Sequence, residues 1–482
     1  MVSMNRRMLF GTLADCAAGV ATRAAGWSLR VPALRNYFLD RLFSSLAAAQ
    51  ADGNPEPEAE EEVRILAPQL RCFIDRLIQQ RPAAARAIVR FVGTWVSDCR
   101  RRHRGKRAGR AAPATVVIEP TDRCNLNCPG CYANSLSSGN DLPYEALETI
   151  VDQVVDMGVT LITISGGEPM LREKEDQVLT RLARKHPNRG LLVYTNGTLI
   201  DEEIADRLAK VGNVFPAISV EGFEHQTDQR RGRGIYEQNR RARRLLAERG
   251  VMCGFSATIT SENAEAICTD EFMDLRIAEG DLFGWFFLMQ PIGRNPRMEL
   301  MVSPEQRALL RQAVRRWRQQ KRPIFLGDFW NDGPLVGGCI AGGRYYFHVY
   351  ANGDISPCVF SPISCGNVLD IDAGKTEYAD LADFVDRNPV FAAYRREQSH
   401  ITDRARPCLL IDHPESFRRV CCQGGWKPAK NMAEGYLDGQ IAGELDTRAS
   451  AWHHYLCQRA CQPRGTYVPQ TASTADRPAA AD

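Results

Sequence analysis

Three cysteines in one short loop constrain this chain more than any other feature. They are spaced as Cys124-x3-Cys128-x2-Cys131. Four-iron clusters that only transfer electrons are normally held by four thiolates, so a loop that supplies three leaves one iron open to another ligand. The spacing alone is also compatible with two different roles. The cysteines could belong to a structural zinc site, which would need a fourth ligand, or they could form disulfides.

The sequence around this loop alternates between strand and helix patterns. Short apolar runs rich in β-branched residues predict strands at 114–121, 161–165, 191–194, 217–220, 252–260 and 285–290. Helical patterns lie between them at 143–157, 172–186, 201–210, 235–249 and 263–279. Alternation of this kind predicts parallel strands with right-handed crossovers, and six such units predict an α/β fold with an open, partial (β/α)6 TIM-like barrel. The polar motifs follow the strands, at the face where such barrels carry their chemistry.

Two further motifs accompany the cysteine loop. The turn 166–169, Gly-Gly-Glu-Pro, follows the second predicted strand, and 219–222, Ser-Val-Glu-Gly, ends the fourth. Together with the loop they resemble the radical S-adenosylmethionine (SAM) enzymes, over roughly residues 113–300. The resemblance implies that the open iron of a 4Fe-4S cluster binds SAM and that the metal ligands are Cys124, Cys128 and Cys131.

The resemblance also implies a set of SAM-binding residues. Glycines without side chains allow the backbone to approach a ligand closely, and in the family this turn contacts the methionine amino group of SAM. Arg231 lies in an Asp-x-x-Arg-Gly stretch whose arginine can reach the SAM carboxylate, although the stretch could also be a solvated basic loop. Asn196 could instead cap a turn. The expected SAM-binding residues are Gly166, Gly167, Glu168, Pro169, Asn196, Ser219, Glu221 and Arg231.

The implied chemistry is reductive cleavage of SAM to methionine and a 5′-deoxyadenosyl radical, which takes hydrogen from a peptide, lipid or small-metabolite substrate. The electron would come from a reductant such as flavodoxin or ferredoxin. No catalytic acid or base can be assigned from the sequence. An alternative is a non-catalytic iron–sulfur electron carrier with the same fold, but a carrier has no need of the Gly-Gly-Glu-Pro turn. An RNA-modifying enzyme is a lesser alternative.

A second group of cysteines follows the predicted barrel. Alternating residues lead into Asn352-Gly353, a strong hairpin signal that would bring Cys339 and Cys358 to neighbouring positions. This pattern resembles the SPASM or twitch extension of radical SAM enzymes and implies one auxiliary 4Fe-4S cluster. The compact cysteine array that completes a full SPASM pattern is missing, which favours the twitch form. The expected ligands are Cys339 and Cys358, completed by Cys408 and one of Cys421 and Cys422, with Cys365 in reserve; several of these could instead be buried thiols.

We expect four regions: a helical N-terminal region with a charged linker (1–112), the radical SAM core (113–300), the auxiliary-cluster domain (301–425) and a partly disordered tail (426–482). Helical patterns at about 34–46, 63–80 and 82–99 predict a cap on the barrel. A membrane-surface anchor is the alternative, because basic residues follow at 100–110. Nucleic-acid binding is not favoured, since the net charge is only +3.

The remaining composition bears on the cellular location. The chain of 482 residues has sixteen cysteines, and most of them fall into cluster-like groups on an α/β scaffold. Thiolate ligation in a reducing compartment therefore accounts for them better than disulfides do. No stretch has the 18 or more apolar residues of a membrane-spanning helix. We expect a cytoplasmic protein, with peripheral membrane contact through the N-terminal helices as the alternative.

Overall fold

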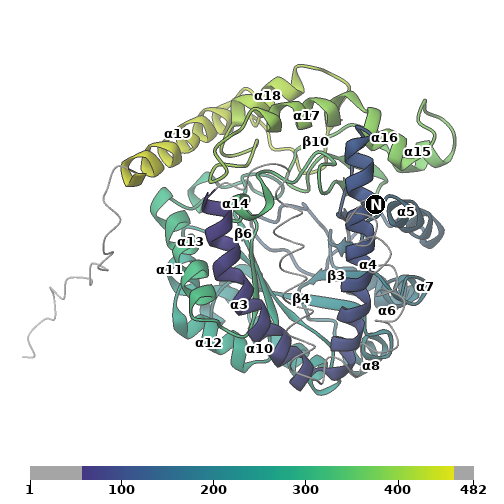
Figure 1. Ribbon diagram of the computed structural model, residues 1–482, viewed down its shortest axis with the longest axis vertical. Coiled ribbons are helices and arrows are strands. Elements are labelled where there is room, and N and C mark those ends of the chain that lie inside the picture. The colour runs from purple at the N-terminus through teal and green to yellow at the C-terminus, as the bar shows by residue number, and fades with distance from the viewer. Residues whose placement is uncertain (1–56, 461–482) are drawn as a thin grey trace, which may run out of the picture.

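The computed structural model describes residues 57–460, and its centre is a mostly parallel sheet of ten strands (Figure 1). The strand order is β11-β9-β8-β1-β2-β3-β4-β5-β6-β7. The first seven strands run parallel to their neighbours, and they are β1 (Thr115–Ile118), β2 (Leu161–Ile164), β3 (Gly190–Thr195), β4 (Val214–Val220), β5 (Gly254–Ile259), β6 (Phe283–Leu288) and β7 (Phe325–Asp328). The predicted α/β barrel architecture is thereby confirmed.

Helices connect these strands and cover the outer face of the sheet. They are α5 (Tyr144–Asp156), α6 (Pro169–Asp176), α7 (Val178–Lys185), α8 (Glu202–Val211), α9 (Glu224–Arg231), α10 (Ile235–Glu248), α11 (Ala264–Ile267), α12 (Asp270–Ala278) and α13 (Pro304–Gln319), with a short 3-10 helix η1 (Met298–Leu300). The predicted helix at 172–186 is interrupted, because the buried carboxylate of Glu173 accepts hydrogen bonds from the backbone nitrogens of Leu179 and Thr180 and starts a second helix. The predicted helix at 263–279 is likewise divided, where Thr269 caps α12.

The sheet continues past the predicted core boundary at residue 300. Strand β7 adds to one side, and β8 (His348–Val349) pairs in parallel with β1 on the other. The predicted hairpin at 352–353 is present, joining β8 to the antiparallel β9 (Asp354–Ser356). The extension therefore shares its sheet with the core and lies at one end of the barrel in Figure 1. Its other elements are α14 (Gly333–Val336), β10 (Ile363–Ser364), β11 (Gly366–Asn367), α15 (Val368–Asp372), α16 (Leu381–Arg387), α17 (Pro389–Ser399), α18 (Pro414–Cys421), β12 (Lys427–Pro428) and α19 (Gln440–Ala460).

The inner face of the barrel is less tightly filled than its outer face. In β1, Val116 and Ile118 are fully buried among the outer helices, whereas Thr115 and Val117 on the inner face stay half-buried. Because residues paired across a sheet point to the same side, His348, the partner of Val117, also faces inward. His348 and the polar residues in line with it on the other strands therefore face the inside of the barrel.

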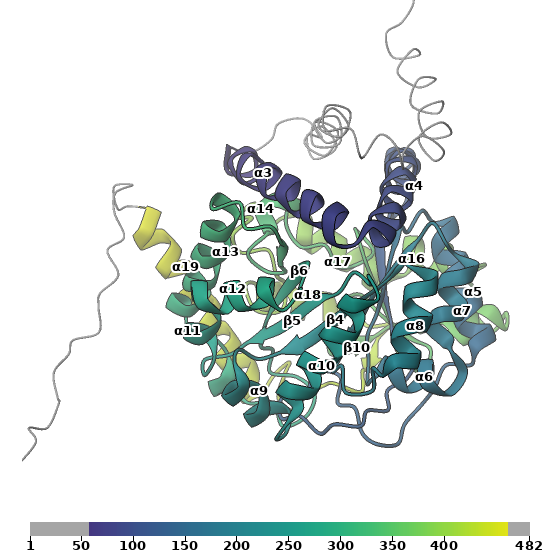
Figure 2. The ribbon, with the colours of Figure 1, turned by 90° about the horizontal axis from the view of Figure 1, so that it is seen from below.

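The N-terminal helices α3 (Pro57–Gln80) and α4 (Pro82–Arg107) form a V against the barrel (Figure 2). Phe73 and Leu77 pack with residues at the amino ends of β4 and β6, such as Phe215 and Phe283. Arg76 donates hydrogen bonds to backbone carbonyls of the loops that precede β6 and β7. These contacts favour the predicted cap over a separate anchor for residues 57–107; the predicted helix at 34–46 lies outside the described residues.

Within residues 57–460, no helix is both long and apolar enough to span a bilayer.

The cap makes a testable prediction about stability. Leu77 is 1% exposed in the apolar layer between α3 and the strands, so Leu77→Ala should lower the free energy of unfolding by about 2–5 kcal/mol. Leu369→Ala, at a position 37% exposed, is the control and should change it by less than about 0.5 kcal/mol. Equal, small effects of the two variants in chemical denaturation would contradict the role of α3 as part of the barrel core.

Candidate metal and cofactor site

The three-cysteine loop lies directly after β1, at the carboxyl end of the barrel. Cys124, Cys128 and Cys131 are free, half-buried thiols. The pKa of Cys124 is raised to about 12, first by burial, then by the charges of Glu168, Cys131 and Cys128. Cys128 and Cys131 therefore lie close enough to Cys124 for their charges to oppose its ionisation. Three thiolates in such a place need a cationic centre beside them, and this donor set fits an iron–sulfur cluster.

The alternative of a single metal ion receives no support from the described part of the chain. Across residues 57–460, no three His, Cys, Asp or Glu side chains converge as ligands of one ion would. A zinc ion needs its ligands within about 2.0–2.3 Å of one centre. No disulfide joins the cysteines of these residues either.

The Gly-Gly-Glu-Pro turn packs directly on the backbone of the cysteine loop. Gly167 N donates to Thr121 O at 3.0 Å, and Glu168 N donates to Arg123 O at 2.8 Å. A Cβ atom on Gly167 would lie 2.0 Å from Arg123 O, and one on Gly166 would lie 2.6 Å from Thr121 O. The close approach that these glycines permit is thus made to the loop's own backbone, a reason that the sequence did not reveal.

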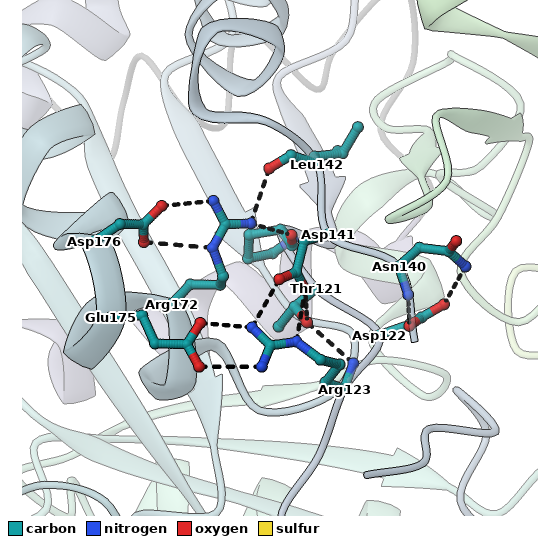
Figure 3. Close-up of polar contacts among 10 residues, drawn as sticks. Thr121, Asp122, Arg123, Asn140, Asp141, Leu142, Arg172, Glu175 and Asp176 are labelled. Atoms are coloured by element: carbon teal, nitrogen blue, oxygen red, sulfur yellow. Dashed lines mark hydrogen bonds and ion pairs between the residues drawn. The ribbon is translucent and has the colours of Figure 1, made fainter. Parts of the chain in front are cut away.

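Arg123 fastens the loop from its outer side (Figure 3). Its guanidinium makes paired hydrogen bonds to Asp141 and to Glu175, with distances from 2.6 to 3.0 Å. Thr121 donates to the same Asp141 carboxylate at 2.5 Å. Nearby, Arg172 bonds Asp176 and the carbonyls of Pro120 and Leu142. Sequence reasoning missed this network, because one arginine beside a cysteine is no signal without its partners.

Glu168 is fully buried and joins the ends of β2 and β3. Its carboxylate accepts hydrogen bonds from Met170 N (3.0 Å), Thr195 Oγ1 (2.7 Å) and Asn196 N (2.7 Å). Burial raises the pKa of Glu168 despite these bonds. Pro169 occupies the first turn of α6, where its missing N–H is harmless. Both carboxylate oxygens thus already have protein partners, and contact of Glu168 with SAM stays a prediction.

Asn196 extends from the end of β3 to the cysteine loop. Its Nδ2 donates to Asn125 Oδ1 at 2.9 Å and lies 4.0 Å from Cys124 Sγ. Its Oδ1 accepts from Thr198 N at 3.0 Å. The structure therefore supports both a turn-capping role and a place beside the cluster loop.

Glu221, at the end of β4, is 1% exposed and holds two arginines. Arg231 Nη2 lies 2.5 Å from Glu221 Oε1, and Arg230 Nη1 lies 2.8 Å from Oε2. Burial opposes the charge of Arg231, but Glu221 and the thiolates of Cys128 and Cys131 more than offset it and raise its pKa. Arg231 is thus placed beside the cysteine loop rather than in solvent.

A cavity of about 180 Å³ opens at this place, lined in part by Pro129, Glu221, Arg230, Thr260 and Asn263. The expected Ser219 lies two residues before Glu221 on β4 and outside this lining, with its hydroxyl 3.4 Å from that of Ser256. Polar groups that follow β4 and β5 therefore line a hollow beside the cysteine loop. Its size and polarity suit part of a small charged ligand.

The second group of cysteines is only partly assembled. Burial raises the pKa of Cys358 to about 12 and that of Cys408 well above its ordinary value, and the charge of Cys339 contributes to both. Cys339, Cys358 and Cys408 therefore lie together. Tyr346 contributes a hydroxyl 2.8 Å from Cys358 Sγ.

Two other candidate ligands of that group, Cys365 and Cys421, show no such influence of these three thiols on their pKa. Cys422 is exposed, and the pKa of Cys421 responds only to burial and to Cys422. The pKa of Cys365 is raised by burial and by the charge of Asp354 only. Tyr436 is buried among Cys358, Cys408 and Cys421. The structure thus leaves the fourth ligand of an auxiliary cluster as a prediction.

Three comparisons with known proteins agree with this geometry. Residues 118–269 match the Radical SAM superfamily. The chain is 35% identical over 155 residues to Fe-coproporphyrin III synthase of Methanosarcina barkeri, which covers 32% of this chain and 38% of that protein. It is 25% identical to PqqA peptide cyclase of Granulibacter bethesdensis over 376 residues, which covers 74% of this chain and 92% of the cyclase. The alignment thus spans well under half of the synthase but nearly all of the cyclase.

A solved structure shares the fold. Streptococcus suis SuiB bound to S-adenosylmethionine superposes with a TM-score of 0.51 at 18% sequence identity, which covers 65% of this chain and 76% of SuiB. At this identity the likeness concerns the fold alone.

The contact between turn and loop can be tested by adding one carbon atom. Gly167→Ala would force its Cβ against Arg123 O, so it should destabilise the cluster-free protein by about 1–3 kcal/mol and reduce iron uptake. Gly443→Ala is the matched control, because its Cβ would meet nothing within 4 Å in α19. Chemical denaturation and iron analysis measure both effects. If the two variants are equally stable, the proposed packing of turn on loop is wrong.

Proposed function

We propose that the protein is a radical SAM enzyme that acts on a peptide, because residues 118–269 match the Radical SAM superfamily. The observation that carries the proposal is the set of three free thiols whose loop packs on the Gly-Gly-Glu-Pro turn. Cys124, Cys128 and Cys131 would hold the 4Fe-4S cluster. Cluster and SAM, when bound, would supply a 5′-deoxyadenosyl radical that takes hydrogen from the substrate.

The chain's own residues would bind and orient the SAM molecule. Arg231 is charged, close to Cys128 and Cys131, and suited to a carboxylate. Glu221 fixes its direction through the 2.5 Å contact. Ser219 and Asn196 offer hydroxyl and amide groups on the inner side of the strands. Glu168 keeps the turn and the β3 loop together, a positioning role that needs no contact with SAM.

The identity of the substrate rests on similarity to one relative. PqqA peptide cyclase matches this chain over most of both sequences, and its name gives a peptide as substrate. A lipid or small metabolite is the alternative, and a flavodoxin or ferredoxin would supply the electron.

We further propose one auxiliary 4Fe-4S cluster held by Cys339, Cys358 and Cys408. The burial of these thiols and the effect of the Cys339 charge on the pKa of Cys358 and of Cys408 support this assignment. The fourth ligand would come from Cys421 after a shift of α18, or from a group outside the chain. Thiolates must form when metal binds, so assembly of this cluster releases protons.

The central experiment measures SAM cleavage. After anaerobic reconstitution with iron and sulfide, reductant plus SAM should yield 5′-deoxyadenosine from the natural chain. Cys128→Ala should fold and yield none, because the cluster loses one of three protein ligands. Cys253→Ala, which removes a buried thiol outside both groups, is the control. Production of 5′-deoxyadenosine by Cys128→Ala would refute the assignment, and a natural chain that binds iron without SAM cleavage would favour the electron carrier.

Iron content tests the auxiliary cluster. The natural chain should bind about eight irons, and Cys408→Ala about four. Cys422→Ala, at an exposed position, should keep about eight. A count near four in the natural chain, measured with the characteristic visible absorption, would exclude the second cluster.

A further inference from the structure

A buried ion cluster joins the C-terminal extension to the base of the cysteine loop. Glu119 follows β1 and has no exposed surface. Lys430 Nζ lies 2.6 Å from Glu119 Oε2, and His348 Nε2 lies 3.1 Å from Oε1. The three residues come from distant parts of the sequence, so only the folded extension brings them together.

Glu119 also lies against the Gly-Gly-Glu-Pro turn. A Cβ atom on Gly166 would lie 2.8 Å from Glu119 Cβ. Ser165, just before this turn, shares a hydrogen bond of 2.5 Å with the hydroxyl of Tyr132, which is next to Cys131. Burial opposes the charge of Glu119, but Lys430 and His348 together keep its pKa below the ordinary value. A charged carboxylate thus lies beneath loop and turn.

Lys430 belongs to a short segment, residues 427–431, that we call the strap. Lys430 O accepts from Asn134 Nδ2 at 3.2 Å, and Asn431 O accepts from Gly293 N at 2.9 Å. The next residue, Arg294, donates its backbone N–H to Cys131 O at 2.9 Å. The strap is therefore in contact with the cysteine loop directly and through the residues after β6.

The other side of the strap leads to the second group of cysteines. β12 pairs with β10, and Ala429 N donates to Pro362 O at 2.9 Å. Ser361, just before Pro362, donates its N–H to Cys358 O at 3.0 Å. A few hydrogen bonds thus connect Cys358 with the base of the SAM-cluster loop.

We propose that Lys430 is a positioning residue through which the extension orders the cysteine loop, so that filling the auxiliary cysteine site and ordering residues 120–134 favour each other. The proposal goes beyond the proposed function and rests on it only for the identity of the two sites. Such coupling is reciprocal, and its usual size is about 5- to 150-fold in an equilibrium constant.

The physical basis is the buried charge of Glu119. Without Lys430 it would face only His348, and an incompletely paired buried carboxylate is costly. The loop and turn would then separate to admit water to it. Lys430 itself has a side chain 22% exposed, so its replacement by methionine removes the charge without opening a large cavity.

The first experiment measures hydrogen–deuterium exchange in the cluster-free, full-length protein. Lys430→Met should speed exchange of peptides within 120–134 by about tenfold, and Lys430→Arg should restore most of the protection. Lys427→Met is the matched control: it removes a lysine of the same strap whose side chain is 60% exposed, and should leave this exchange unchanged. Glu119→Gln added to Lys430→Met removes the unpaired carboxylate, so this double variant should regain part of the protection.

Unchanged exchange in Lys430→Met, an equal effect of Lys427→Met, or no regained protection in the double variant would each overturn the role of Lys430. Circular dichroism checks folding. Should Lys430→Met fail to fold, the double variant with Glu119→Gln decides: recovery of folding supports the role of the ion pair, and continued failure to fold overturns it.

The second experiment isolates the coupling. A variant with all three cysteines of the loop changed to alanine is reconstituted with iron and sulfide, so that only the auxiliary site can fill. Bound iron should slow exchange within 120–134, and Lys430→Met in the same background should abolish that slowing. Bound iron with unchanged exchange would overturn the coupling. No bound iron would overturn both the auxiliary cluster and the coupling, while the first experiment would still decide the role of Lys430.

Discussion

The contact of the Gly-Gly-Glu-Pro turn with the backbone before Cys124 is the constraint on which the site depends. Two hydrogen bonds and the missing side chains of Gly166 and Gly167 hold the turn against residues 121–123. The Cβ atom of any side chain at Gly167 would lie 2.0 Å from the carbonyl oxygen of Arg123 and collide with it. Backbone groups that lie this close fix the loop more firmly than side-chain contacts, because they have few rotatable bonds to reorder.

Charged groups surround this contact, and each of them has partners of opposite charge. Arg123 is paired with two carboxylates outside the loop, Glu221 with two arginines beside it, and Glu119 with Lys430 beneath it. Buried charges are tolerated only when such partners are present. The cysteine loop is the exception, since in the metal-free protein burial and the neighbouring charges of Glu168, Cys131 and Cys128 oppose the ionisation of Cys124. An iron–sulfur cluster would complete the charge balance of the site.

The two ends of the barrel have different tasks. At the amino ends of the strands, α3 and α4 cover apolar residues, and arginines of these two helices donate hydrogen bonds to loop carbonyls. These contacts stabilise the barrel. At the carboxyl ends, short loops each bond to the next, from the cysteine loop through Glu168 to Asn196. The extension closes this face by adding β8 beside β1 and by sending the strap back to Glu119. The expected chemistry thus lies at the carboxyl ends of the strands, and the stabilising contacts of α3 and α4 lie at the amino ends.

The sequence by itself determined the strand–helix alternation, the three-cysteine loop and the turn one unit later, because these depend on local periodicity and on spacing within a few residues. It also located the hairpin at 352–353. Only the tertiary structure decided which charged side chains meet: Arg123 with Glu175, and Glu119 with Lys430. It also divided the helix at 172–186 through the buried Glu173. These pairings join residues tens to hundreds of positions apart, and one sequence carries no signal of contacts that packing alone creates.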